Sequence, residues 1–141
     1  MNEQEIKQAL ATLEMYRVQA ESLAEQQQII QFSLDEYTRA RETLSKWRAA
    51  EPDAELLVPV GGNSFVFAKV ADNKRALVGV GSGVTVEKPV EEAIKTLETR
   101  INELAEAAKK IAESIFMLEQ RSTQLQQVVQ AEYERLQQQQ G

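Results

Sequence analysis

Two residue types with versatile chemistry are missing from this chain. Its 141 residues include no cysteine, which excludes disulfides, a thiol nucleophile and cysteine-based metal sites. They include no histidine either, so the commonest general base and the commonest metal ligand are absent. We therefore expect no catalytic residues, no metal site and no cofactor, and we expect that the chain is not an enzyme.

Phosphate-binding motifs are lacking as well. Gly79, Gly81 and Gly83 lie close together, but a dinucleotide-binding loop needs G-x-G-x-x-G between a strand and a helix. Here the spacing differs, and the residues that follow predict another strand. No G-x-x-x-x-G-K-[S/T] motif occurs. Acidic pairs such as Glu91 and Glu92 fall on solvated helical faces, where paired carboxylates do no acid–base work.

The charge balance excludes two further kinds of partner. Sixteen Lys and Arg against 22 Asp and Glu give a formal net charge of −6, with no basic stripe for nucleic acid. An anionic membrane surface would repel such a chain. No apolar run approaches the roughly 20 residues of a membrane span, and no signal peptide follows Met1. We expect no nucleic-acid or membrane partner and a cytoplasmic location.

A heptad pattern fills the first 50 residues, which contain no proline and no glycine. Apolar side chains occupy most a and d positions over six heptads, which is typical of a coiled coil. Gln27 and Arg41 break the pattern: Gln27 either fixes the register or simply reaches water, and Arg41 extends its charge into solvent. Pro52 predicts the helix end. The a positions are Ile6, Leu13, Ala20, Gln27, Leu34 and Arg41, and the d positions are Ala9, Tyr16, Leu23, Ile30, Tyr37 and Leu44.

A second heptad pattern follows Pro89, which suits the first helical position. Its exceptions are Ser122 and Glu132. Helices of similar length joined by a compact segment predict an antiparallel pair, in which residue i lies beside roughly residue 138 − i. We expect 137–140 and Gly141 to fray into solvent. The a positions are Ile94, Ile101, Ala108, Ile115, Ser122, Val129 and Leu136, and the d positions are Leu97, Leu104, Ile111, Leu118, Leu125 and Glu132.

The segment between the helices predicts two β-hairpins. Alternating apolar residues indicate strands over 55–60, 64–70, 75–80 and 84–87, and turn residues separate them. Pro59 suits an edge or a bulge. Isolated hairpins are marginally stable in water and their edges need covering, so we expect them to close a shared sheet or barrel with other subunits. The predicted assembly residues are Val58, Val60, Phe65, Val66, Phe67, Leu77, Val78, Val80, Val84 and Val86.

The predicted fold class is mainly α with a small β insertion. It is a long antiparallel two-helix coiled coil with two central β-hairpins that assemble into an intersubunit β-barrel. Residues 1–50 form the N-terminal helix, 51–88 the oligomerisation hairpins and 89–141 the C-terminal helix, in one structural unit overall. Such a chain has no compact core, so its function should lie in surfaces rather than in a pocket.

Residues 57–70, LVPVGGNSFVFAKV, and 78–94, VGVGSGVTVEKPVEEAI, stand between two long heptad helices. This arrangement resembles the prefoldin family over nearly the whole chain, and two hairpins resemble its alpha class. The resemblance implies a hexamer of two alpha and four beta-type subunits. It also implies an ATP-independent chaperone that holds unfolded client proteins with its coiled-coil tips and delivers them to a group II chaperonin. Trp47 matches no motif of the family.

Apolar side chains outside the heptad seams predict where unfolded protein binds. Most of them fall in the half of each helix that is remote from the hairpins, and methionine suits a promiscuous surface. The alternative is that they widen the seam or are harmless. Ile29 and Phe32 share this exposed character. The predicted binding residues are Leu10, Met15, Val18, Phe116, Met117, Val128 and Tyr133.

A different class of function is a structural coiled-coil spacer or a filament-forming prefoldin paralogue that self-assembles through the same hairpins. A chaperone subunit should need a single-hairpin partner to form a defined hexamer. A filament former should polymerise alone as its concentration rises.

Overall fold

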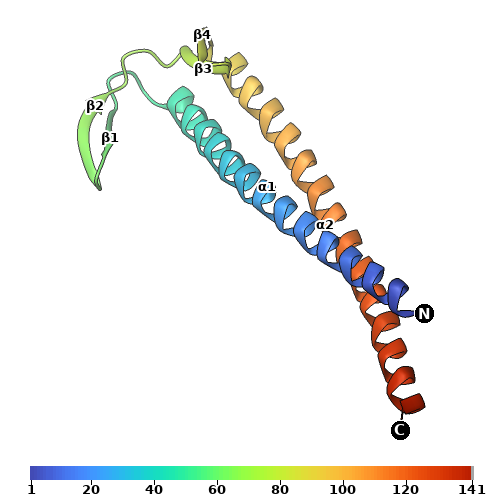
Figure 1. Ribbon diagram of the computed structural model, residues 1–141. Helices are drawn as coiled ribbons and strands as arrows, with labels where there is room; N and C mark the ends of the chain where they lie inside the picture. Colours follow the sequence, from blue (N-terminus) through green and yellow to red (C-terminus); the bar gives the residue numbers. More distant parts are fainter. Residues whose placement is uncertain (141) are drawn as a thin grey trace. The chain divides into compact units, whose positions relative to one another are not determined.

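The computed structural model describes residues 1–140 and has two long helices that enclose two hairpins in the sequence (Figure 1). The predicted mainly helical fold with two central β-hairpins is therefore confirmed. No helix among the described residues is long and apolar enough to cross a membrane. The elements are α1 (Glu3–Ala49), β1 (Glu55–Gly61), β2 (Ser64–Lys69), β3 (Arg75–Gly81), β4 (Val84–Pro89) and α2 (Val90–Gln140).

The chain divides into two compact units, and both helices contribute to each. The arm unit comprises Met1–Phe32 and Ala105–Gly141, and the hairpin unit comprises Ser33–Leu104. Each unit has its own packing.

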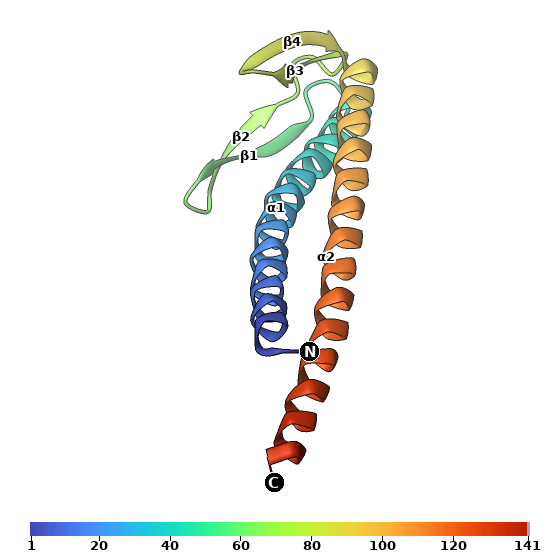
Figure 2. The same ribbon diagram turned by 45° about the vertical axis from the view of Figure 1, so that its right-hand side comes forward.

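In the arm unit α1 and α2 run side by side in opposite directions (Figures 1 and 2). The Asn2 side chain accepts a hydrogen bond of 2.8 Å from the Glu5 amide and so caps the start of α1. Because only two helices pack together, their side chains are covered along one line of contact, and most a and d residues here are half-buried. The fully buried ones are Ile6, Ala9, Leu118 and Val129.

The end of α2 differs from the prediction. The helix continues through Gln140, although 137–140 are exposed, because glutamine is a good helix former and needs no partner to stay helical at the end of a long helix. The expectation for Gly141 lies outside the described residues. The amino group of Met1 lies 3.0 Å from the Glu132 carboxylate, so the last turns of α2 have no α1 beside them (Figure 2).

The two hairpins follow one plan. β3 begins as many residues after β1 as β4 begins after β2, so the second hairpin repeats the spacing of the first. Each hairpin has a two-residue turn with both φ angles positive, +57° and +57° at Gly62 and Asn63, and +53° and +74° at Ser82 and Gly83. Each first strand also shows a register shift just before the turn, between Pro59 and Gly61 in β1 and between Gly79 and Gly81 in β3. The shift beside Pro59 confirms that this proline suits a bulge.

The hairpins differ in what supports them. They form two separate two-stranded sheets. Val78 of β3 packs against Ala93 and Leu97 of α2, with Tyr37 and Leu44 of α1 around them, and this cluster is the core of the hairpin unit. No residue of β1 or β2 belongs to that cluster.

The start of α2 corrects the sequence prediction by one residue. Pro89 ends β4 and Val90 begins the helix. The Val90 amide donates a 2.8 Å hydrogen bond to the Lys74 carbonyl, which extends the β3–β4 ladder past Pro89 and keeps the proline in the strand.

Candidate functional site

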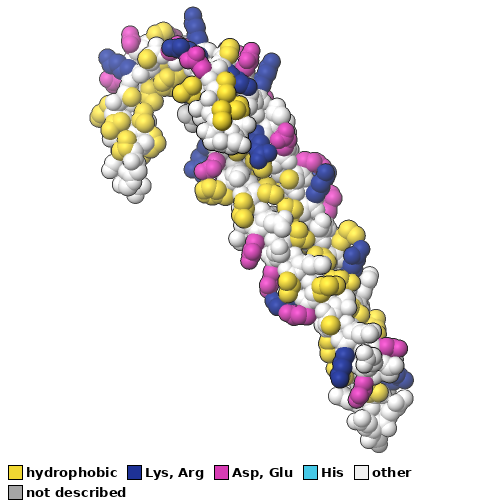
Figure 3. Space-filling model, turned by 45° about the horizontal axis from the view of Figure 1, so that its top comes forward, with side chains coloured by type: hydrophobic (Ala, Val, Ile, Leu, Met, Phe, Trp, Pro, Cys, Tyr) yellow, Lys and Arg dark blue, Asp and Glu magenta, His cyan; other side chains and the backbone are white. Residues whose placement is uncertain are grey.

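The β1–β2 hairpin is apolar on both faces. Leu57 pairs with Phe67 and Pro59 with Phe65 on one face, and Val58 pairs with Val66 on the other. Phe67 is 84% exposed, and the space-filling view shows hydrophobic side chains gathered over this hairpin (Figure 3). A hairpin that is apolar on both faces gains stability only when both are covered.

The β3–β4 hairpin has one face covered by its own chain. Val78, at the place equivalent to Val58, is 4% exposed, whereas Val58 is 36% exposed. On the opposite face Arg75 forms a 3.0 Å ion pair with Glu87 around the exposed Leu77. Nine of the ten predicted assembly residues are exposed. Val78 differs because it packs on the two helices and supports the hairpin from within.

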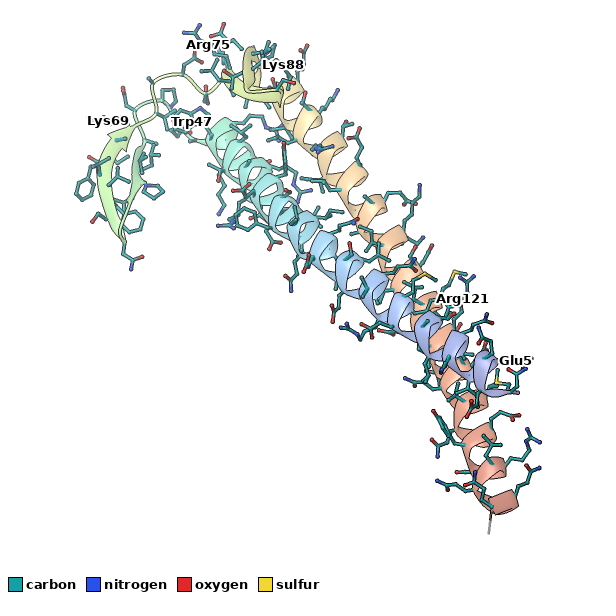
Figure 4. All side chains as sticks on the ribbon, in the orientation of Figure 1. Glu5, Trp47, Lys69, Arg75, Lys88 and Arg121 are labelled. Atoms are coloured by element: carbon teal, nitrogen blue, oxygen red, sulfur yellow. The ribbon has the colours of Figure 1, made fainter. Side chains whose placement is uncertain are left out.

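The linker between the hairpins is anchored to the end of α1, at Trp47 (Figure 4). The Trp47 indole donates a 2.8 Å hydrogen bond to the Asp72 carbonyl. The Asn73 amide donates to the carbonyls of Arg48 and Ala50, at 3.2 and 3.0 Å, and so caps the end of α1. Trp47, which matched no sequence motif, thus helps to anchor the linker between the hairpins to the end of α1.

Asp72 completes this anchor. Its carboxylate accepts hydrogen bonds of 2.8 Å from the Lys74 amide and from the Arg75 guanidinium. The amide bond, followed by the Arg75 bond, lowers the pKa of Asp72 below its usual value. Because Arg75 also reaches Glu87, the linker is tied to β4 through one side chain.

In the arm unit the seven predicted client-binding residues are all exposed, by 43 to 57%, but they do not form one patch. Leu10 and Tyr133 line one groove together. Phe116 lies at the edge of that groove beside Thr123. Val128 lies in another hollow, with Tyr16, Leu125 and Arg121. Met15, Val18 and Met117 occupy c and f positions, which point away from the heptad seam.

The groove is the largest concave feature described for the arm unit. Two overlapping hollows of about 720 and 860 Å³ share Leu10, Leu13, Thr123 and Gln126, and together we name them the two-helix groove. It follows one side of the seam, where the e and b positions of both helices lie. Its apolar lining comprises Leu10, Leu13, Tyr16, Ala20, Ala24, Ile115, Leu118, Val129, Ala131 and Tyr133.

Most of this lining was missed from the sequence. Four of the lining residues are a or d residues, which we expected to be buried between the paired helices: Leu13, Tyr16, Ala20 and Ile115. All four remain half-buried, because a two-stranded seam covers each side chain from one direction only. Small residues at a positions, Ala20 and Ser122, were the available signal, since they leave space that no partner side chain fills.

The groove has an acidic rim. Glu14 and Glu21 lie on the α1 side, and both form ion pairs with Arg17, the one cation in the lining. The hydrogen bond from Arg17 lowers the pKa of Glu14 below its usual value. Glu119 and Glu134 lie on the α2 side. The rim therefore carries four carboxylates against one guanidinium.

The described residues present exposed apolar and charged surfaces. Among residues 1–140 no group of three acidic side chains is placed to hold a metal ion. The shifted carboxyl groups, Glu14, Asp72 and Glu132, are all ion-paired on the surface, Glu132 with the terminal amine and Arg135. The exposed apolar groups can bind other polypeptide chains, and the charged groups can select among them.

Comparisons with known proteins agree with this arrangement. The family described as prefoldin subunit matches residues 16–135. The prefoldin subunit alpha of Methanocorpusculum labreanum is 37% identical over 135 residues, covering 96% of this chain and 92% of that protein.

Two solved structures are similar as well. The cryo-EM structure of filamentous PFD from Methanocaldococcus jannaschii has a TM-score of 0.68 at 25% identity and covers 80% of this chain and 93% of that one. The crystal structure of the prefoldin beta subunit from Thermococcus strain KS-1 has a TM-score of 0.60 at 19% identity, with 90% of each chain covered, and shares the fold.

Proposed function

The chain belongs to the prefoldin family, and from this premise we propose that it is a cytoplasmic, alpha-type subunit of an ATP-independent chaperone and not an enzyme. It combines with beta-type prefoldin subunits, two alpha to four beta, and holds non-native polypeptides until a group II chaperonin receives them. The observation that carries the proposal is the presence of an uncovered apolar hairpin and an apolar arm surface in one chain.

Assembly falls to the hairpins. Leu57, Phe65 and Phe67 cover one face of β1–β2 with apolar surface, and Val58 and Val66 cover the other. Hairpins from neighbouring subunits, closing a β-barrel, would cover both faces and pair the open strand edges. The exposed valines near the β3–β4 turn, Val80 and Val84, give the second hairpin an apolar surface of its own.

Client binding falls to the arm unit. Leu10, Tyr133 and Phe116 in or beside the two-helix groove, with Met15, Val18, Met117 and Val128 elsewhere on the unit, give several small apolar sites. Each site alone is weak. Several arms that engage one unfolded chain raise the effective concentration at every further site, so a weak surface on each subunit is sufficient.

Light scattering tests the assembly. The chain alone should give no discrete hexamer, and mixing with a beta-type subunit should give one of hexamer mass. A fully folded, monodisperse monomer that ignores the beta-type subunit would contradict the proposed assembly.

A four-site variant tests client binding. Changing Leu10, Met15, Val18 and Val128 to Ser should weaken the suppression of client aggregation by the assembled hexamer, because it removes apolar area from the arm unit. The matched control changes four exposed polar residues, Gln8, Gln19, Gln26 and Gln137, to Ser. Equal suppression by both hexamers would reject the arm unit as the client-binding surface.

Filament formation is the second candidate. It is favoured by the similarity to the filamentous PFD of Methanocaldococcus jannaschii. The higher identity to a prefoldin subunit alpha favours the hetero-oligomer. Long polymers of the chain alone that a beta-type subunit does not dissolve would reverse this order.

A further inference from the structure

The two-helix groove has the dimensions of a seat for a third helix. Its lining runs from Leu10 to Ala24 along α1, which is about 21 Å at 1.5 Å per residue and matches a helix of about 14 residues. Ala20, Ala24 and Ser122 leave open places along the floor, where side chains from another helix can insert.

The groove also favours helical over extended occupants. All its walls are helical, so no strand edge is present there to pair with an extended chain. An extended segment laid on the apolar floor would leave backbone groups without partners, whereas a helix satisfies its own. An amphipathic helix would bury its apolar stripe between α1 and α2, which is how helices bind in grooves generally.

Charge then selects among helices. The rim holds Glu14, Glu21, Glu119 and Glu134, and Arg17 is already paired with the first two. The arginines of this part of α2, Arg121 and Arg135, occupy g positions, on the other side of the seam. The arm unit as a whole has ten Glu and six Lys or Arg. Lys7 and Lys109 occupy b positions but do not line the groove, so its lining is acidic, with four Glu and one Arg.

From this geometry we propose that the two-helix groove binds client segments as a third helix and prefers amphipathic segments whose apolar stripe is flanked by Lys and Arg. The inference rests on the proposed holdase function and adds the kind of segment that this subunit recognises. Segments with acidic flanks should bind outside the groove.

Two labelled peptides, each about 18 residues or five helical turns long, test the preference by fluorescence anisotropy with the full-length chain, alone and in the hexamer. They share one apolar helical stripe and differ in flanking Lys or Glu. We expect the Lys peptide to bind at least about fivefold more tightly at low ionic strength, and the ratio to approach one at high salt. The Lys peptide should gain helical circular dichroism on binding.

Two rim variants locate the site. Glu119→Gln with Glu134→Gln should weaken binding of the Lys peptide about threefold at low salt. The control, Glu106→Gln with Glu113→Gln, makes the same charge change on α2 at positions that do not line the groove. Its effect on binding should be less than about a third as large.

The outcomes separate the two proposals. A hexamer that suppresses client aggregation but binds both peptides equally, or is weakened equally by both variants, overturns the groove inference alone. Self-association of arm units that displaces the Lys peptide overturns it too, because the groove would then hold a second copy of the chain. A hexamer that neither suppresses aggregation nor binds peptide overturns the proposed function and, with it, this inference.

Discussion

Val58 and Val78 occupy the same place in two hairpins of one plan, so truncating each to Ala isolates the effect of their surroundings. Both residues lie in a first strand, opposite Val66 and Val86 respectively. The loss of β propensity on changing Val to Ala is therefore similar at the two positions. What differs is burial, 36% exposure for Val58 and 4% for Val78.

The magnitudes follow from that difference. Val78→Ala removes two buried carbon atoms, worth about 1.6 kcal/mol of transfer free energy, and leaves a cavity beside Ala93 and Leu97, so we expect a loss of about 2 kcal/mol in the free energy of unfolding. Val58→Ala leaves no cavity and removes atoms that water already reaches, so the loss in the dilute chain should be about 0.5 kcal/mol.

Urea unfolding of the dilute chain, followed by the fluorescence of its single tryptophan, measures the loss of unfolding free energy for each variant. Trp47 belongs to the hairpin unit and donates to the linker beside β3, so its signal reports on this unit. When beta-type subunits are added, Val58→Ala should weaken the hexamer more than Val78→Ala does, although Val78→Ala destabilises the dilute chain more. Equal shifts of the unfolding midpoint for the two variants would refute the conclusion that only one hairpin is supported by its own chain.

Further substitutions test the turns and the anchor. Gly81→Ala should cost about 1–2 kcal/mol because φ is +110° there, whereas Gly79→Ala, with open space and an ordinary φ, should be nearly neutral; thermal unfolding compares them, and equal costs would contradict the backbone argument. Asn73→Ala should cost about 1 kcal/mol by leaving the Arg48 and Ala50 carbonyls uncapped, which urea unfolding compared with the parent chain measures; an unchanged midpoint would show that water replaces the cap. Because the folded-state pKa of Asp72 is lowered, its contribution is present above the ordinary value of 3.8 and is lost as pH falls through the folded value; the difference in urea midpoint between Asp72→Asn and the parent at pH 7 should therefore shrink as the pH is lowered below 3.8, and a constant difference would reject this.

Local signals made most of the fold predictable. Proline at 52, glycine-rich turns and a sustained heptad frame are short-range rules, and apart from the end of α2 the helix and strand boundaries fall within one or two residues of them. The prediction that Pro89 begins the helix was wrong by one residue. The Val90 amide donates a hydrogen bond to the carbonyl of Lys74, just before β3, and this bond outweighed the preference of proline for the first helical turn.

The surfaces were less predictable, since exposure depends on what packs from elsewhere in the chain. Val58 and Val78 look alike in sequence, and only tertiary packing separates them. In the arm unit the heptad rule assigned Leu13 and Ile115 to the seam but could not say that the seam stays half open. Trp47 and Asn73 donate hydrogen bonds to backbone carbonyls that lie far away along the chain, and no local pattern marks such pairs.

The unsupported β1–β2 hairpin has a consequence for biosynthesis. When Lys69 is joined to the growing chain, 72 residues of this sequence remain to be made, which takes about 4–14 s at 5–20 residues per second, whereas a hairpin forms in microseconds. Completing these residues does not end its exposure, because the core cluster formed by the described residues includes none from β1 or β2. With the proposed assembly, the lifetime of this apolar surface is set by the supply of partner subunits and not by the rate of translation, and a cell that makes this subunit in excess should accumulate a protein that itself needs protection from aggregation.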